Sequence, residues 1–181
     1  MSTENTKENK PEKNYETFSK NGLPSSSGSL HGNANIWFYK IVGEKLYLLF
    51  QKRAKNVHNG GTFDTTAGGH VDRGETHFEA VVRETEEEIG IKLKPEELYY
   101  IYGFNSGSSI FQIYLSDRTD REDVFTLNYE EVEALEWVEL KDVDDFVKKN
   151  AKSPLKTNKA HFIILHEYFE KLLSSRSSEA N

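Results

Sequence analysis

Short apolar and aromatic runs recur through the middle of the chain, bounded by glycine, asparagine and serine. Runs of this kind are typical of β-strands. They predict strands at 35–41, 46–53, within 60–69, and at 98–104, 109–117 and 131–140. The turn sequence VGEK is expected to join the first two strands into a hairpin, and NSGS to join the strands at 98–104 and 109–117.

Three further stretches are predicted to be helices, at residues 76–89, 141–150 and 158–173. The last of them has closely spaced apolar positions and is expected to pack on the sheet. One mixed sheet with helices on its faces is the economical way to bury these elements, so the fold class is predicted to be α/β.

The two ends of the chain differ from the middle. Residues 1–33 are poor in large aliphatic side chains and rich in Ser, Asn, Lys and Glu, so we expect a disordered or extended N-terminal segment. Residues 34–173 are expected to form the folded domain, and residues 174–181 a flexible tail.

Composition narrows the function classes. The formal charge of −7 argues against binding to a nucleic acid polymer. The chain has no cysteine, which excludes disulfides, thiolate metal sites and cysteine nucleophiles and fits a cytoplasmic location. No apolar run approaches the roughly 20 residues of a membrane span, so no membrane association is expected.

The predicted helix at 76–89 carries an unusual set of carboxylates. Thr76 is its expected N-cap, with Glu79 completing a capping box. With Glu84 at 0° and about 100° per residue, Glu87 falls near 300° and Glu88 near 40°. These three therefore share one ridge beside an apolar stripe, which consists of Phe78, Val81, Val82, Thr85 and Ile89.

Glu79 and Glu86 point away from this ridge and are expected to be ordinary solvated acids. Like charges at spacings of three and four residues repel, and they lie in the last turn, where the helix dipole also disfavours anions. Only Arg83 is near enough in sequence to compensate. Clustered hard oxygen ligands beside a glycine turn indicate a site for Mg²⁺ or Mn²⁺, although a solvated charged face is the simpler alternative.

The same residues carry a family resemblance. The positions Gly69, Glu75, Arg83, Glu84, Glu87, Glu88, Gly90 and Ile91 resemble the Nudix box, G-x5-E-x7-R-E-U-x-E-E-x-G-U, where U is a bulky aliphatic residue. The first U position holds Thr85 instead. Its hydroxyl is expected to return to a backbone carbonyl, with a small loss of stability and none of chemistry.

The resemblance implies a Nudix α/β/α sandwich with a mixed central sheet, and Mg²⁺- or Mn²⁺-dependent hydrolysis of a diphosphate bond. The substrate would be a nucleoside diphosphate linked to another moiety, or a similar organic diphosphate. The implied metal ligands are Glu84, Glu87, Glu88 and the Gly68 carbonyl, and the implied catalytic group is these three glutamates with Arg83. Gly69, Glu75 and Gly90 would be structural. One more acid from a distal loop is expected, with Glu130 and Glu131 as candidates.

A weaker resemblance, to the isopentenyl-diphosphate-isomerase-like branch of the superfamily, follows the sequence around TFDTTAGGHVDRGE. An isomerase needs a cysteine where Gly68 stands, so isomerase activity is the less favoured alternative. His31 and His70 match metal ligands of that enzyme but are expected here to be pocket or structural residues. In this branch, residues such as Lys52, Arg53 and Lys55 face the phosphates. We therefore predict substrate binding by Arg53, Lys55 and His70.

Two questions stay open at this level. A Nudix domain can be a non-catalytic ligand-binding module, although such domains usually lose acids of the box, and homodimers are common among relatives. The group attached to the diphosphate is not encoded in the box. Aromatic residues available for stacking on a base are Trp37, Tyr39, Tyr100, Tyr102 and Phe111.

Overall fold

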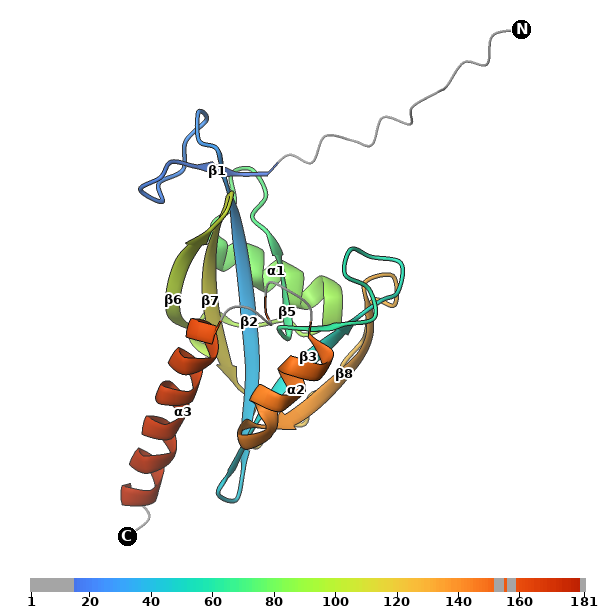
Figure 1. Ribbon diagram of the computed structural model, residues 1–181, viewed down its shortest axis with the longest axis vertical. Coiled ribbons are helices and arrows are strands. Elements are labelled where there is room, and N and C mark those ends of the chain that lie inside the picture. Colours follow the sequence, from blue (N-terminus) through green and yellow to red (C-terminus); the bar gives the residue numbers. More distant parts are fainter. Residues whose placement is uncertain (1–14, 152–154, 156–158, 180–181) are drawn as a thin grey trace, which may run out of the picture.

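The computed structural model describes residues 15–151, 155 and 159–179 (Figure 1). Its strands are β1 (Thr17–Phe18), β2 (Leu30–Val42), β3 (Lys45–Arg53), β4 (Phe63–Asp64), β5 (Ala67–His70), β6 (Tyr99–Ser106), β7 (Ser109–Asp117) and β8 (Val132–Glu139). Its helices are α1 (His77–Ile89), α2 (Val143–Asn150) and α3 (Lys159–Glu179), with 3₁₀ turns at Pro95–Glu97 and Leu140–Asp142.

Strand β2 is the centre of one mixed sheet. The sheet has the order β4-β3-β2-β7-β6, in which β2 and β3 form the predicted hairpin and β6 and β7 the second antiparallel pair. Strands β2 and β7 run parallel. Strand β5 pairs with the first half of β2, and β8 pairs with β3, so both lie off the main strand order.

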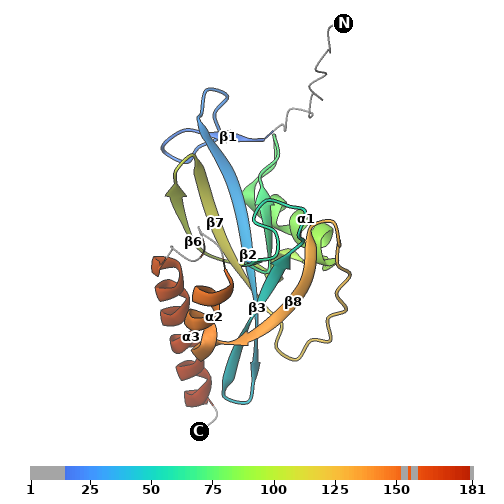
Figure 2. The same ribbon diagram turned by 45° about the vertical axis from the view of Figure 1, so that its right-hand side comes forward.

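Alternating side chains of the central strands bury two separate cores. In β2, Trp37, Tyr39 and Ile41 face the core beneath α2 and α3, whereas Ile36 and Phe38 face the core beneath α1. Because successive side chains of a strand point to opposite faces, a run that is apolar throughout requires a helix layer on each side. Figure 2 shows α1 on one face and α2 and α3 on the other. The predicted α/β/α sandwich with a mixed sheet is confirmed.

Two stretches of the chain differ from their predictions. The stretch 60–69 forms two short strands, because the Thr66 hydroxyl accepts the Phe38 N–H and donates to the Leu49 carbonyl where two strands separate. Helix α3 continues beyond residue 173 to Glu179. There the Ser174 and Ser175 hydroxyls bond to carbonyls four residues earlier, as serine can within a helix.

The N-terminal boundary also differs. Strand β2 begins at Leu30, ahead of the predicted strand start at residue 35 and of the predicted domain start at residue 34, and β1 pairs with it through Thr17 and Phe18. Residues 1–14 of the predicted N-terminal segment lie outside the described residues. Within the described ranges, no helix is long and apolar enough to cross a membrane.

Candidate active site

Both ends of α1 are fixed by local chemistry. The Thr76 hydroxyl accepts the Glu79 N–H while the Glu79 carboxylate accepts the Thr76 N–H, which confirms the predicted capping box. Gly90 ends the helix in the left-handed conformation with φ of 73°, and a Cβ there would lie 2.7 Å from Thr126. A glycine therefore suits this position both by its backbone and by its close neighbour.

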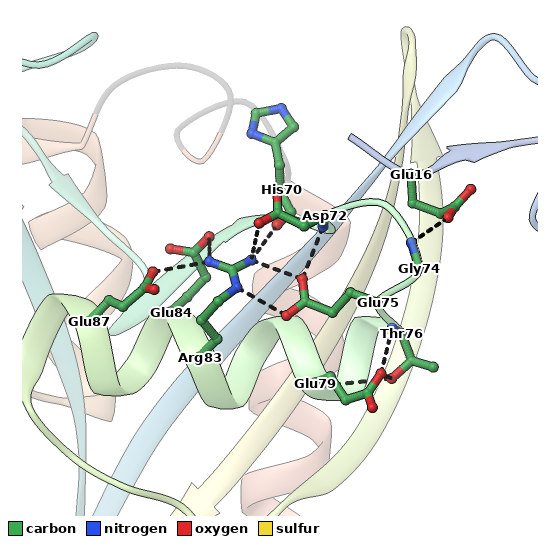
Figure 3. Close-up of polar contacts among 10 residues, drawn as sticks. All are labelled: Glu16, His70, Asp72, Gly74, Glu75, Thr76, Glu79, Arg83, Glu84 and Glu87. Atoms are coloured by element: carbon green, nitrogen blue, oxygen red, sulfur yellow. Dashed lines mark hydrogen bonds and ion pairs between the residues drawn. The ribbon is translucent and has the colours of Figure 1, made fainter. Parts of the chain in front are cut away.

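Arg83 neutralises the acidic face of α1 (Figure 3). Its guanidinium binds Glu75 through two hydrogen bonds of 3.0 Å each, and its Nη1 donates to Glu84 at 2.8 Å and to Glu87 at 3.1 Å. Its Nη2 also donates to the His70 carbonyl at 2.9 Å. One planar donor group thus ties α1 to the β5–α1 loop and offsets the repulsion between its carboxylates.

Gly69 allows the Glu84 carboxylate to lie against the backbone of β5. A Cβ at residue 69 would stand 2.2 Å from the Glu84 Oε1 atom. Any side chain would therefore push the carboxylate out of its place. The glycine of the motif is explained by this contact, since a missing Cβ permits close backbone approach.

Glu84, Glu87 and Glu88 all line the cleft described below, but Glu88 is the buried member of the ridge that the helical angles predicted. It is 3% exposed, whereas Glu87 is exposed. The physical reason is that its angle near 40° borders the apolar stripe, on the side of α1 that faces the sheet. Its Oε2 accepts hydrogen bonds from the Gln51 side chain at 2.9 Å and from the Gly68 N–H at 3.0 Å.

The acids of α1 have unequal proton affinities. Burial raises the pKa of Glu88 to about 8, and the charges of Glu84 and Glu131 add to this against the two hydrogen bonds that Glu88 accepts. Burial also raises the pKa of Glu84, although Arg83 opposes this increase. At neutral pH the buried carboxyl of Glu88 is therefore mainly protonated until a cation favours its charged form.

A cleft of about 630 Å³ opens over these acids. Its walls include Gly68, Gly69, Arg83, Glu84, Glu87 and Glu88, which brings the motif together in one place. Of the two distal candidates, Glu131 lines the cleft and Glu130 does not. Arg53 and His70 also line it, whereas the exposed Lys55 and the partly buried His31 do not.

Four other residues considered in the sequence analysis, Glu79, Glu86, Thr85 and Lys52, do not line the cleft. Glu79 and Glu86 are exposed, as predicted. The Thr85 hydroxyl donates to the Val81 carbonyl at 2.6 Å, which confirms the expected bond. Lys52 pairs with Glu133 at 2.6 Å.

The donors of the cleft suit a divalent cation. Carboxylates and a backbone carbonyl are the hard oxygen ligands that Mg²⁺ and Mn²⁺ prefer, and a partly buried acid cluster with raised pKa values gains from added positive charge. In the described part of the chain, no three acid or histidine side chains converge as a ready ion-binding group. Arg83 already engages Glu84 and Glu87, so a cation would compete with its guanidinium for them.

Sequence reasoning missed several residues of the site, one that contacts Glu88 and four that line the cleft. Gln51 carried a signal, since it is a polar residue in an otherwise apolar part of β3 and is only 2% exposed. Asn35, Asp64 and His58 line the cleft from strands and loops that carry no motif. Tyr15 also lines it, from the segment expected to be disordered or extended, and nothing in its local sequence indicated this.

Comparison with known proteins identifies the family. The model of the NUDIX domain matches residues 30–161. An uncharacterized Nudix hydrolase of Clostridium acetobutylicum is 32% identical over 129 residues, which are 66% of this chain and 62% of that protein. Nudix hydrolase 3 of Arabidopsis thaliana is 25% identical over 135 residues, 67% of this chain but 17% of that protein.

Solved structures show the same fold. A Deinococcus radiodurans protein superimposes with a TM-score of 0.64 at 17% identity, over 79% of this chain and 94% of that one. A Caenorhabditis elegans Ap4A hydrolase in a binary complex gives 0.58 at 19% identity, over 80% and 99%. The NUDIX domain of Shewanella oneidensis NrtR, complexed with ADP ribose, gives 0.56 at 17% identity, over 84% and 94%.

The sandwich and the matched domain together define a Nudix fold. The chain belongs to the Nudix family. It spans less than two thirds of the length of the two curated relatives described above.

Proposed function

We propose that this chain hydrolyses a diphosphate bond, in a nucleoside diphosphate linked to another moiety or in a similar organic diphosphate, with Mg²⁺ or Mn²⁺. The observation that carries the proposal is that Arg83 and the three motif glutamates of α1, which are Glu84, Glu87 and Glu88, line one cleft. A non-catalytic binding module would not require all of these acids. The absence of cysteine, with Gly68 at the relevant position, argues against the isomerase alternative.

The residues have distinct roles in this proposal. Glu84, Glu87, Glu88 and the Gly68 carbonyl hold the cation, which supplies charge to the phosphate oxygens and lowers the pKa of bound water. Arg83 fixes the carboxylates of α1, and Glu75 fixes Arg83. Glu84 or a neighbouring acid accepts the proton of the attacking water, and Glu131 is the acid contributed by the distal loop.

Space for the rest of the substrate lies beside the cleft. A cavity of about 350 Å³ shares Asn35, Asp64 and Phe111 with it and is lined on its far side by Phe104 and His161. Among the five aromatic candidates, Phe111 alone lines both spaces, whereas Trp37 and Tyr39 are buried in the core beneath α2 and α3. The named activity of the Ap4A hydrolase and the ADP ribose bound to NrtR support nucleotide-like substrates for this chain.

Phosphate release across a panel of nucleotide sugars, dinucleotides, nucleoside triphosphates and prenyl diphosphates tests the proposal with Mg²⁺ present. Glu87→Gln and Glu88→Gln are expected to lose turnover. Glu86→Gln is the matched control, because Glu86 lies on the same helix turn but is exposed outside the cleft. Equal turnover in wild type and in both cleft variants would refute the catalytic assignment.

A further inference from the structure

The segment Tyr15–Phe18 precedes the residues 30–161 that the family model matches, yet it is joined to the loop between β5 and α1. The Glu16 N–H donates to the Val71 carbonyl at 2.9 Å, and the Glu16 carboxylate accepts the Gly74 N–H at 2.8 Å (Figure 3). Tyr15 forms an antiparallel bridge with Asp72. One backbone and one side-chain hydrogen bond from Glu16 thus hold this segment against the loop between β5 and α1.

Phe18 anchors the segment in the core. It is 4% exposed, belongs to the core beneath α1 and packs with its ring 5.0 Å from that of His77. A Cβ at Gly32 would stand 2.6 Å from the Phe18 ring, so the glycine leaves the space that this ring fills. Burial of a phenylalanine side chain contributes enough to keep a short strand in place. The position of Tyr15, three residues earlier, is therefore restrained.

Tyr15 contributes a wall of the cleft that holds the acids of α1. Its ring stacks on the His70 imidazole with centroids 4.2 Å apart and 20° between the planes, and it meets His31 edge-on at 5.9 Å. The His70 carbonyl is held by Arg83, so the backbone and the ring of this residue are fixed by separate partners. Figure 3 shows the His70 ring directed away from Glu84 and Glu87.

We propose that Tyr15 is a positioning residue, and that its stack with His70 forms the wall against which the substrate rests beyond the diphosphate. The inference rests on the hydrolase function proposed for the same cleft. Because this wall lies away from the acids, it contributes to binding of the substrate and of the transition state alike. Its loss therefore raises KM and leaves kcat nearly unchanged.

Full-length Tyr15→Ala, Tyr15→Phe and Tyr99→Ala proteins test the proposal with whichever substrate of the panel wild type hydrolyses. Loss of one aromatic pair predicts a KM about three- to tenfold higher for Tyr15→Ala, with kcat within about twofold. Tyr15→Phe keeps the stack and is expected to restore the wild-type KM. Tyr99→Ala is the control, since this half-exposed tyrosine lies outside the cleft.

A second measurement does not depend on turnover. The ring signals of His70, assigned with His70→Gln in protein labelled at histidine, are expected to shift in Tyr15→Ala and to stay near wild type in Tyr15→Phe. If wild type hydrolyses no substrate of the panel, the proposed function fails. The His70 signals still test the Tyr15–His70 stack, on which the inference depends. Unchanged His70 signals in Tyr15→Ala, or a lower kcat at constant KM, would overturn the inference.

Discussion

Replacement of Gln51 by leucine isolates one contact of the site. Gln51 is 2% exposed and donates to the Glu88 Oε2 atom at 2.9 Å, and leucine fills a similar volume without a donor. Glu88 would then keep only the Gly68 N–H as a donor to that oxygen. Gln51 does not line the cleft, and its other hydrogen bond, to the Thr66 carbonyl, is longer at 3.4 Å, so the main effect on the site passes through Glu88.

The expected loss of metal affinity follows from the charge that the Glu88 carboxylate carries when it binds a metal. A hydrogen bond to a charged group contributes about 1.5–3 kcal/mol, and removing a partner behind a metal ligand typically costs about 10- to 100-fold in metal affinity. The direction in which this loss of metal affinity changes with pH also follows from the structure. Burial raises the pKa of Glu88 to about 8 and the Gln51 bond lowers it, so Gln51→Leu raises this pKa further. Because a carboxylate must lose its proton to bind metal, affinity falls most near neutral pH and recovers as pH increases.

Two measurements check this prediction. Calorimetric titration with Mn²⁺ gives the affinity without substrate, and the Mg²⁺ dependence of turnover between pH 6.5 and 9 gives the pH effect. Gln112→Leu is the matched control, because Gln112 lies on β7 and bonds to the Tyr114 hydroxyl at 2.7 Å, not to Glu88. An unchanged Mn²⁺ affinity in Gln51→Leu, or a loss that does not recover at high pH, would refute the reasoning.

Other consequences of the same contacts can be measured directly. Mg²⁺ is expected to raise the melting temperature of wild type, and no shift at saturating Mg²⁺ would count against the acid cluster as a metal site. Without metal, stability should fall as pH rises from about 4.5 to 8, because folded Glu88 keeps a proton that the unfolded chain has lost. The slope reaches at most about 1.4 kcal/mol per pH unit, and Glu88→Gln should flatten it in thermal melts. Gly69→Ala should displace the Glu84 carboxylate and lower kcat by about 100-fold or more with little change in melting temperature, since the atom displaced is the end of a flexible side chain. Arg83→Met should lower both turnover and melting temperature because it removes the donors that neutralise Glu75, Glu84 and Glu87. A variant that melts at the wild-type temperature would contradict that role. Thr85→Val should keep turnover and change stability by about 1 kcal/mol or less, measured by urea unfolding.

Local signals in the sequence were sufficient for most of the fold. Two apolar runs separated by the turn sequence VGEK predicted the hairpin of β2 and β3, and the capping residues at Thr76 and Gly90 set the limits of α1. These features depend on neighbours within a few residues, so the chain encodes them directly. The stretch 60–69 was predicted as one strand rather than two, because the Thr66 hydroxyl that separates β4 from β5 bonds to strands distant in sequence.

The motif spacing by itself determined which acids of α1 belong together and that Arg83 would compensate them, because residues three and four apart share a helix face. Only the tertiary structure decided that Glu88 is buried against Gln51, that Glu131 rather than Glu130 faces the cleft, and that Tyr15 forms part of its wall. These contacts join residues far apart in the chain. Their geometry depends on how β3, β5 and the N-terminal segment pack around α1, which no local pattern of residues specifies.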